Sequence, residues 1–208
     1  MKEKVLYNID MNNGFVNFGP MANPEYLKLV PEQKKMFEKM FRENGQINFV
    51  LEAHDPNALE FKTYPPHCIK DTKEAEVIDE FLKYKNVPGV RVFGKNCING
   101  MFNEDARNQI RELKALKEVI IEGVCADLCV MDFARGLARY LDEINKEAKI
   151  FVVRNAIDTF DAPGHNREEW LEIAEKVMTQ AGIEYVEDIK ELEEKEKQYH
   201  LVSDVYAE

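Results

Sequence analysis

Strand-like and helix-like segments alternate along the whole chain, and this alternation restricts the fold more than any other feature. The strand-like segments are short and apolar, at residues 4–10, 47–53, 89–94, 118–122, 148–153 and 183–186. Helical spacing of apolar residues fills most intervals, at 24–44, 71–84, 104–116, 126–145 and 165–181. Strands without polar alternation are typical of parallel sheets covered by helices on both faces. We therefore predict an α/β fold, a three-layer α/β/α domain with a mostly parallel six-stranded sheet.

Chain length and charge limit the domain organisation and the partners. The 208 residues suffice for one α/β domain, expected over residues 1–190, with residues 191–208 as a charged helix and tail. We interpret that tail either as a solvated helix or as a contact with another subunit. The formal net charge of −11 disfavours binding to nucleic acid or to anionic membranes, because such binding needs a basic face.

The sequence also indicates a compartment. No apolar run is long enough to span a bilayer, and no signal peptide precedes the first strand-like segment. The four cysteines lack the spacing of a disulfide framework, so we expect reduced thiols at Cys68, Cys97, Cys125 and Cys129. We therefore expect a soluble, cytoplasmic protein, and a small neutral or cationic ligand is compatible with its charge.

Reactive side chains stand where the predicted strands end. Asp10 ends the first strand, Glu52 and His54 follow the second, Lys95 follows the third, and Cys125 follows the fourth. In open parallel sheets the ligand crevice lies beyond the carboxyl ends of the strands. We therefore predict that these side chains meet in one crevice.

The segment GVCADLCV, residues 123–130, carries two of the four thiols. A disulfide between Cys125 and Cys129 would be awkward one helical turn apart, and a zinc clip would need further ligands nearby. Packing in the core is the commonest role of a free cysteine. For Cys129, however, a place in the first turn of a helix favours the thiolate and offers free N–H groups to an oxyanion. Cys125, at the strand terminus, is expected to contribute its backbone N–H.

Asp10 and Lys95 each allow an ordinary and a catalytic interpretation. Asp10 is either a turn residue or a general base toward a thiol across the crevice. Lys95 is either a solvated lysine or the partner of a carboxylate that stabilises charge in a transition state.

The loop after the second strand-like segment holds two imidazoles and two carboxylates within sixteen residues: Glu52, His54, Glu60 and His67. Such donors suit zinc, iron or manganese, although mixed sets also arise by chance in polar loops. The run Tyr64–Pro66 stiffens the segment and would hold His67 in place.

Together these motifs resemble the cysteine hydrolases of the isochorismatase-like superfamily, most closely the nicotinamidases. The resemblance runs from Asp10 to about residue 192, through IDMNNGF, YPPH, FGKNCINGMF and GVCADLCV. It implies Asp10, Lys95 and Cys129 as the catalytic residues. It also implies a cis peptide between Val124 and Cys125, with the N–H groups of Cys125 and Cys129 forming an oxyanion hole.

The resemblance further implies a divalent metal, zinc or else iron or manganese, that binds the pyridine nitrogen of the substrate. Its ligands would be Glu52, His54, Glu60 and His67. The chain departs from the family pattern in Glu52, where aspartate is usual, in Ala126, where threonine is common, and in Met101, where an aromatic residue is common.

The implied reaction is hydrolysis of nicotinamide to nicotinate and ammonia in NAD salvage, through a thioester on Cys129. Phe15 or Phe18 could stack on the substrate ring or pack in the core, and the family implies a homo-oligomer, a dimer or a tetramer. Two alternatives stay open: an amidase for N-carbamoyl or ureido substrates, and a non-catalytic relative with the same fold. Isochorismatase activity is disfavoured, because it would leave the metal loop unexplained.

Overall fold

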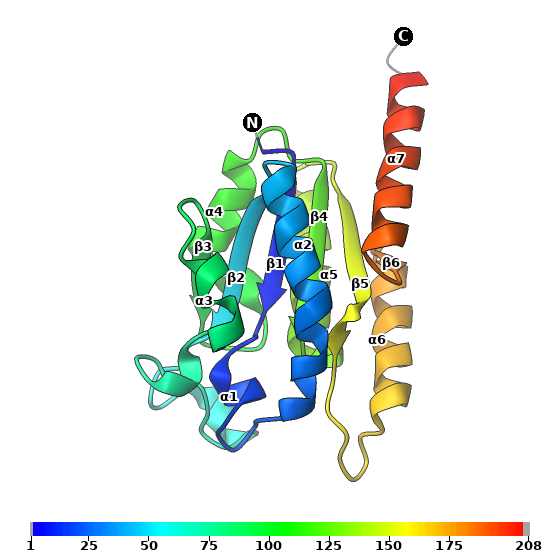
Figure 1. The fold of residues 1–208 in the computed structure, drawn as a ribbon. Helices are drawn as coiled ribbons and strands as arrows, with labels where there is room; N and C mark the ends of the chain where they lie inside the picture. The colour runs from blue at the N-terminus through cyan, green and yellow to red at the C-terminus, as the bar shows by residue number, and fades with distance from the viewer. Residues whose placement is uncertain (1, 206–208) are drawn as a thin grey trace.

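A parallel six-stranded sheet forms the centre of the computed structural model, which describes residues 2–205 (Figure 1). The strands are β1 (Lys4–Ile9), β2 (Gln46–Glu52), β3 (Arg91–Lys95), β4 (Glu118–Val124), β5 (Lys149–Asp158) and β6 (Glu184–Val186). They pair in the order β3-β2-β1-β4-β5-β6, and every pairing is parallel. The predicted fold class is therefore confirmed.

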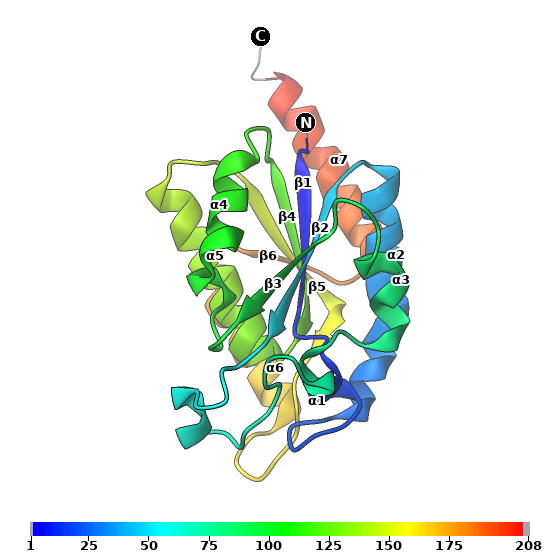
Figure 2. The same ribbon diagram turned by 90° about the vertical axis from the view of Figure 1, so that its left-hand side faces the viewer.

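Two layers of helices cover the sheet (Figure 2). The α-helices are α1 (Asn13–Val16), α2 (Val30–Arg42), α3 (Leu82–Lys85), α4 (Glu104–Glu112), α5 (Met131–Glu143), α6 (Arg167–Gln180) and α7 (Ile189–Val205). The shorter turns are η1 (Pro24–Leu29), η2 (Leu59–Lys62), η3 (Lys73–Ala75), η4 (Asp79–Phe81), η5 (Gly100–Phe102) and the π-helical η6 (Ala126–Val130). Helices α2, α3 and α7 pack on one face of the sheet, and α4, α5 and α6 pack on the other.

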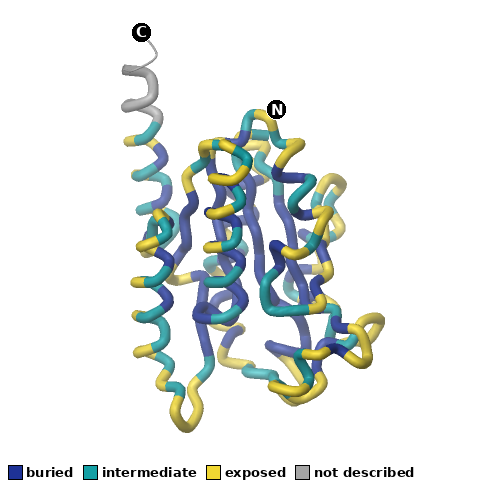
Figure 3. Tube along the Cα trace, turned by 180° about the vertical axis from the view of Figure 1, so that it is seen from behind, coloured by how far each residue is buried: buried dark blue, intermediate teal, exposed yellow. Residues whose placement is uncertain are grey.

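The central strands are apolar because helices cover both of their faces (Figure 3). Along β4, Ile120 packs toward α2, whereas its neighbours Val119 and Ile121 pack toward α5. Both kinds of position are fully buried, so a strand of this sheet needs an apolar side chain at nearly every residue.

Helix α7 is held against the domain by buried charges. Leu192 is buried on its inner face, and the Glu196 carboxylate lies 2.7 Å from the Lys39 ammonium and 2.9 Å from that of Lys4. The division into residues 1–190 and 191–208, and a subunit contact through the tail, stay predictions, with residues 206–208 outside the described part. Among the described residues, no helix combines the length and apolar character needed to cross a membrane.

The predicted helix over 71–84 is wrong. The chain forms only η3, η4 and α3 there, with an extended stretch at Val77 between the first two. The Asn13 N–H donates to the Glu76 carbonyl at 2.9 Å, and the Ile78 N–H donates to the Met11 carbonyl at 3.1 Å. Pairing with the segment after β1 therefore outweighs the local helical pattern, and it ties that segment down beside the site.

Candidate active site

Asp10 and Lys95 form a buried ion pair at the carboxyl ends of their strands. Asp10 follows β1 with its backbone in the left-handed region, at φ 50°. Its N–H donates to the Val50 carbonyl at 2.9 Å, and its Oδ2 lies 2.8 Å from the Lys95 Nζ. Lys95 ends the edge strand β3 and is 4% exposed. Asp10 and Lys95 therefore meet at the carboxyl edge of the sheet, as their positions at the strand ends predict.

Glu52 connects this pair to the metal loop. It is paired in register with Lys95 across β2 and β3, and the Lys95 ammonium donates to its Oε1 at 2.7 Å. The Glu52 backbone N–H donates to the Asp10 Oδ1 at 2.8 Å. Lys95 is thus held between two buried carboxylates, which fixes its position and keeps it charged.

Cys129 completes the group from the opposite side. Its thiol lies 3.6 Å from the Lys95 Nζ and 3.7 Å from the Glu52 Oε1. The thiol sulfur and one oxygen each of Asp10 and Glu52 all lie within 4.8 Å of one another. Cys129 belongs to the π-helical turn η6 that leads into α5, at the position where the sequence predicts an ordinary helical turn. The Val124–Cys125 peptide is cis, as the resemblance implies, and all four cysteines are free thiols.

Burial and charge set the protonation of these groups. Burial raises the pKa of the Asp10 carboxyl to about 6, although the Lys95 ammonium opposes the rise. Burial opposes the charge on Lys95 as well, but Asp10, Cys129 and Glu52 outweigh it and raise the lysine pKa. Burial raises the Cys129 pKa well above its usual range, and both carboxylates add to that rise. The Lys95 ammonium opposes this rise in the Cys129 pKa, but burial outweighs it, so the effect of the helix start on the thiol stays a prediction.

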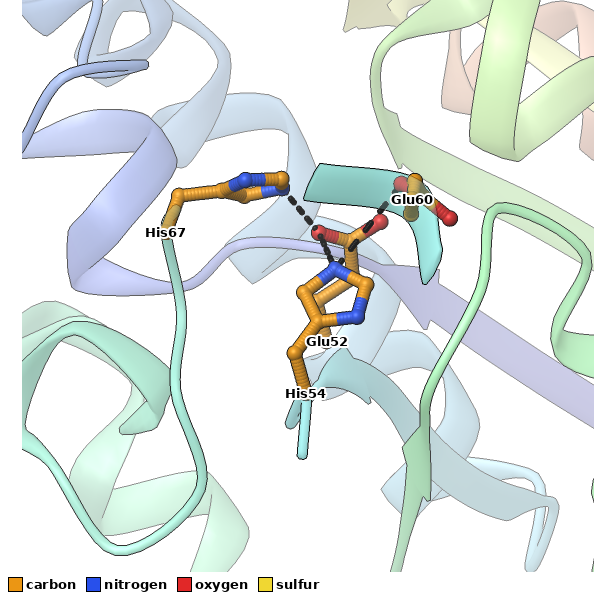
Figure 4. A group of neighbouring side chains, drawn as sticks. All are labelled: Glu52, His54, Glu60 and His67. Atoms are coloured by element: carbon orange, nitrogen blue, oxygen red, sulfur yellow. Dashed lines mark hydrogen bonds and ion pairs between the residues drawn. The ribbon is translucent and has the colours of Figure 1, made fainter. Parts of the chain in front are cut away.

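The four predicted metal ligands converge on one point (Figure 4). The Glu52 Oε2 lies 3.0 Å from the His54 Nε2 and 2.7 Å from the His67 Nε2. The Glu60 Oε1 lies 3.8 Å from the His54 Nε2, and its Oε2 accepts from the Ile98 N–H at 3.1 Å. Burial opposes protonation of both imidazoles, but the Glu52 carboxylate outweighs it and raises their pKa values.

This donor set fits a divalent metal ion. One ligand atom from each of the four residues lies within 4.8 Å of the other three. The His67 Nδ1 lies 2.8 Å from the Pro65 carbonyl, an acceptor that holds the proton on Nδ1 and leaves Nε2 available as a ligand. Two imidazoles with two carboxylates suit zinc, iron or manganese.

A cavity of about 440 Å³ lies beside Cys125. Phe15, Tyr26 and Phe160 line it, and the ring of Phe15 also contacts that of His67 edge-on, with centroids 5.3 Å apart. Phe15 is also part of the buried core, so its stacking on a substrate ring stays a prediction. Phe18 follows α1, is 48% exposed, and is absent from the cavity wall, because the chain turns away at residue 19.

Sequence reasoning missed three contributions to this region. Glu52 contacts Lys95 and Cys129 as well as the imidazoles, and its place opposite Lys95 in adjacent strands was the available signal. Asn12 donates to the Glu52 carbonyl at 3.0 Å and fastens it from the segment after β1. Tyr26 contacts the Cys125 sulfur at 3.4 Å through its hydroxyl, a pairing that no local spacing indicates.

Comparisons with known proteins agree with this geometry. Nicotinamidase 1 of Arabidopsis thaliana is 30% identical over 172 residues, which cover 76% of this chain and 70% of that protein. The crystal structure of N-carbamoylsarcosine amidase from Thermoplasma acidophilum matches with a TM-score of 0.70 and 25% identity, covering 89% of this chain and 96% of that one. Pyrazinamidase of Pyrococcus horikoshii in complex with zinc has the same fold, with a TM-score of 0.72 and 22% identity over 89% of this chain and 99% of that one.

The sequence profile of the isochorismatase domain matches residues 4–181, which is most of the chain. The fold, the buried Asp10–Lys95–Cys129 group and this match agree with the resemblance that the motifs indicate. The chain belongs to the isochorismatase family.

Proposed function

We propose that this protein is a cysteine-dependent amide hydrolase, a nicotinamidase that converts nicotinamide and water to nicotinate and ammonia. One observation carries the proposal: a buried Asp10–Lys95–Cys129 group shares Glu52 with a set of metal ligands. The similarity to Nicotinamidase 1 supports the choice of substrate.

The first half-reaction forms a thioester. Because the Cys129 thiol is protonated at rest, its attack on the amide carbon must be coupled to loss of its proton. Asp10 is the base for that proton, since its pKa of about 6 lies near neutral pH. Asp10 then gives the proton to the departing nitrogen, the C–N bond breaks, and ammonia leaves. Lys95 stays charged and stabilises the negative charge that passes between the sulfur and Asp10.

The second half-reaction releases the acid. A water molecule attacks the thioester carbon while Asp10 accepts its proton. The C–S bond then breaks, Asp10 passes that proton to the sulfur to restore the Cys129 thiol, and the carboxylic acid loses its own proton to solvent to give nicotinate. In both half-reactions we propose that the backbone N–H groups of Cys125 and Cys129 hold the oxyanion. Removal of one such donor typically costs about 10²–10³ in kcat.

Glu52, His54, Glu60 and His67 would hold the metal ion, with zinc as the proposed occupant. When bound, such an ion supplies a Lewis acid that can accept a lone pair from the substrate ring or from water. Phe15, whose ring contacts that of His67 edge-on, would lie beside a ring bound there. Glu52 contacts both Cys129 and His67, so the ligand set and the thiol lie on either side of one side chain.

We further propose a role in NAD salvage, a cytoplasmic location and a homo-oligomeric state. Four free thiols, one of them the nucleophile, suit a reducing compartment. The net charge of −11 supports a small-molecule substrate without nucleic-acid or membrane partners.

The experiment is ammonia release by the purified protein from nicotinamide, pyrazinamide and N-carbamoyl amino acids, with and without a chelator. We expect turnover of nicotinamide, loss of that turnover in Cys129→Ala, and loss on chelation that added zinc restores. Turnover of the N-carbamoyl substrates alone would instead favour the second candidate, an amidase of that class, which the match to N-carbamoylsarcosine amidase supports. Unchanged nicotinamide turnover in Cys129→Ala would refute the mechanism.

A further inference from the structure

A buried polar contact joins the turn of the nucleophile to a distant loop. Asp127 lies in η6, two residues before Cys129, and is only 2% exposed. Its Oδ2 lies 2.9 Å from the Nε2 of His165, and its Oδ1 accepts from the Thr159 hydroxyl. Both partners belong to the segment between β5 and α6, which is more than thirty residues further along the chain.

The His165 ring is held by two aromatic rings and two oxygen acceptors, although it is only partly buried. It is stacked between Phe160, with centroids 3.9 Å apart and planes 11° apart, and Trp170, at 4.9 Å and 3°. Its Nδ1 lies 3.1 Å from the Phe160 carbonyl, so both ring nitrogens face oxygen acceptors. Paired backbone hydrogen bonds between Ala162 and His165, at 3.0 and 2.9 Å, close the tight turn that carries it. Such a ring has little freedom to move unless the whole loop moves.

The same loop forms one wall of the cavity beside Cys125. Phe160, Asp161 and Arg167 line that cavity, opposite Phe15 and Tyr26. Arg167 is itself held by the buried Asp158 at 2.6 Å. The loop therefore touches the space next to the proposed oxyanion hole, and its buried polar link to the nucleophile turn runs through Asp127.

We propose that His165 is a positioning residue that fastens the Phe160–Arg167 wall of the substrate cavity to the Cys129 turn through Asp127. Asp127 accepts one hydrogen bond from the loop on each oxygen, so the turn and the wall share one anchor. If the His165 contact is lost, the wall should recede from the acyl group and the nucleophile turn should lose a constraint. KM should then rise and kcat should fall together. The choice of nicotinamide as the substrate in this inference rests on the proposed function.

Two substitutions separate the hydrogen bond from the stack. His165→Gln keeps an N–H donor that can reach Asp127 but removes the aromatic ring, whereas His165→Phe keeps a ring between Phe160 and Trp170 but donates nothing. We expect His165→Phe to lose about tenfold or more in kcat/KM for nicotinamide, and His165→Gln to retain most of it, because a misplacement of about 1 Å can cost as much as 10²-fold. Lys176→Ala, an exposed change on α6, is the control and should match the wild type.

A second measurement does not depend on the substrate. The rate at which iodoacetamide alkylates Cys129, followed on its own peptide by mass spectrometry, should change in His165→Phe and stay near the wild-type rate in His165→Gln. If His165→Phe does not fold, the double variant Asp127→Asn, His165→Phe removes the charge that has lost its His165 partner, keeps an acceptor for the Thr159 hydroxyl and carries the same comparison.

Equal kcat/KM values and equal alkylation rates in His165→Gln and His165→Phe would overturn the inference, whether both variants match the wild type or both are impaired. If the wild type releases no ammonia from nicotinamide, the proposed function fails, while the alkylation rates still test the role of His165.

Discussion

Gly123 is the residue of β4 that lies against the end of β1, and a single methyl group there should disturb the whole site. Its φ is +124°, a conformation that side chains rarely adopt. A Cβ at this position would lie 2.0 Å from the Ile9 carbonyl oxygen and 2.7 Å from the Ile9 nitrogen. Ile9 is the last residue of β1, and Asp10 follows it.

The size of the effect follows from these distances. Backbone strain of this kind costs about 1–3 kcal/mol. The contact with Ile9 adds to that cost, because 2.0 Å is about 1.5 Å short of ordinary van der Waals separation, and the obstacle is backbone rather than a flexible side chain. We therefore expect Gly123→Ala to lower the free energy of unfolding by about 3 kcal/mol or more, within the range of severe single substitutions.

Relief of the clash must push the end of β1 away from β4, which displaces Asp10 from its 2.8 Å contact with Lys95. A displacement of about 1 Å can cost about 10² in rate, so ammonia release should fall by about that factor even where the variant is folded. Urea denaturation measures the stability, and ammonia release in the native range measures the activity.

Gly182→Ala is the matched control. Gly182 also has a positive φ, at +84°, but no atom lies within 4 Å of its added Cβ. That variant should show the strain alone, about 1 kcal/mol, and keep its activity. If Gly123→Ala proves no less stable than Gly182→Ala and equally active, the reasoning from contact geometry is wrong.

Three further outcomes are expected. Cys125→Ala should retain ammonia release, because only the backbone of Cys125 has a proposed role. Cys129→Ala should lose ammonia release with an unchanged unfolding curve. Equal losses of ammonia release in the two variants would contradict these assignments. Zinc at about 100 times its dissociation constant should stabilise the metal-free wild type by about 2.7 kcal/mol in a thermal shift assay. The same zinc concentration should stabilise His54→Ala less, and equal stabilisation of the wild type and the variant would remove His54 from the ligand set. Burial raises the pKa of Glu122, so the folded protein keeps a proton that the unfolded chain releases above pH 4.5, and stability falls as the pH rises from there. Glu122→Gln keeps an acceptor for the Asn8 amide, 2.8 Å away, but has no carboxyl to titrate. Its free energy of unfolding relative to the wild type should therefore increase between pH 4.5 and 8 in urea titrations. A difference that stays constant with pH would show that the buried proton has no effect.

The layers and the meeting of Asp10, Lys95 and Cys129 could be predicted because each depends on a local pattern. Continuous apolar strands indicate a sheet covered on both faces, and the parallel order brings Asp10, Lys95 and Cys129 to one edge. The grouping of Glu52, His54, Glu60 and His67 could be predicted because the four residues fall within sixteen positions of the chain, and their role as metal ligands stays a prediction.

The features that were missed depend on contacts between distant segments. The helix predicted over 71–84 is replaced by pairing with the segment after β1, and no local propensity reports such a partner. The Cys129 pKa depends on how completely the thiol is buried between two carboxylates, which position in a helix does not reveal. Phe18 is an aromatic residue that could line a pocket, but it follows α1 and its side chain is exposed to solvent.

Glu52 has a consequence for how this enzyme could change over evolution or in the laboratory. One of its oxygens faces Lys95 and Cys129, and the other faces both imidazoles of the metal loop. If the proposed metal site and mechanism hold, a substitution of Glu52 chosen to alter metal preference also alters the charge beside the Cys129 thiol, and one chosen to tune Lys95 also changes the ligand set. Metal selectivity and proton transfer would then not be independently adjustable at this position, so a useful change in either should require compensating changes in both.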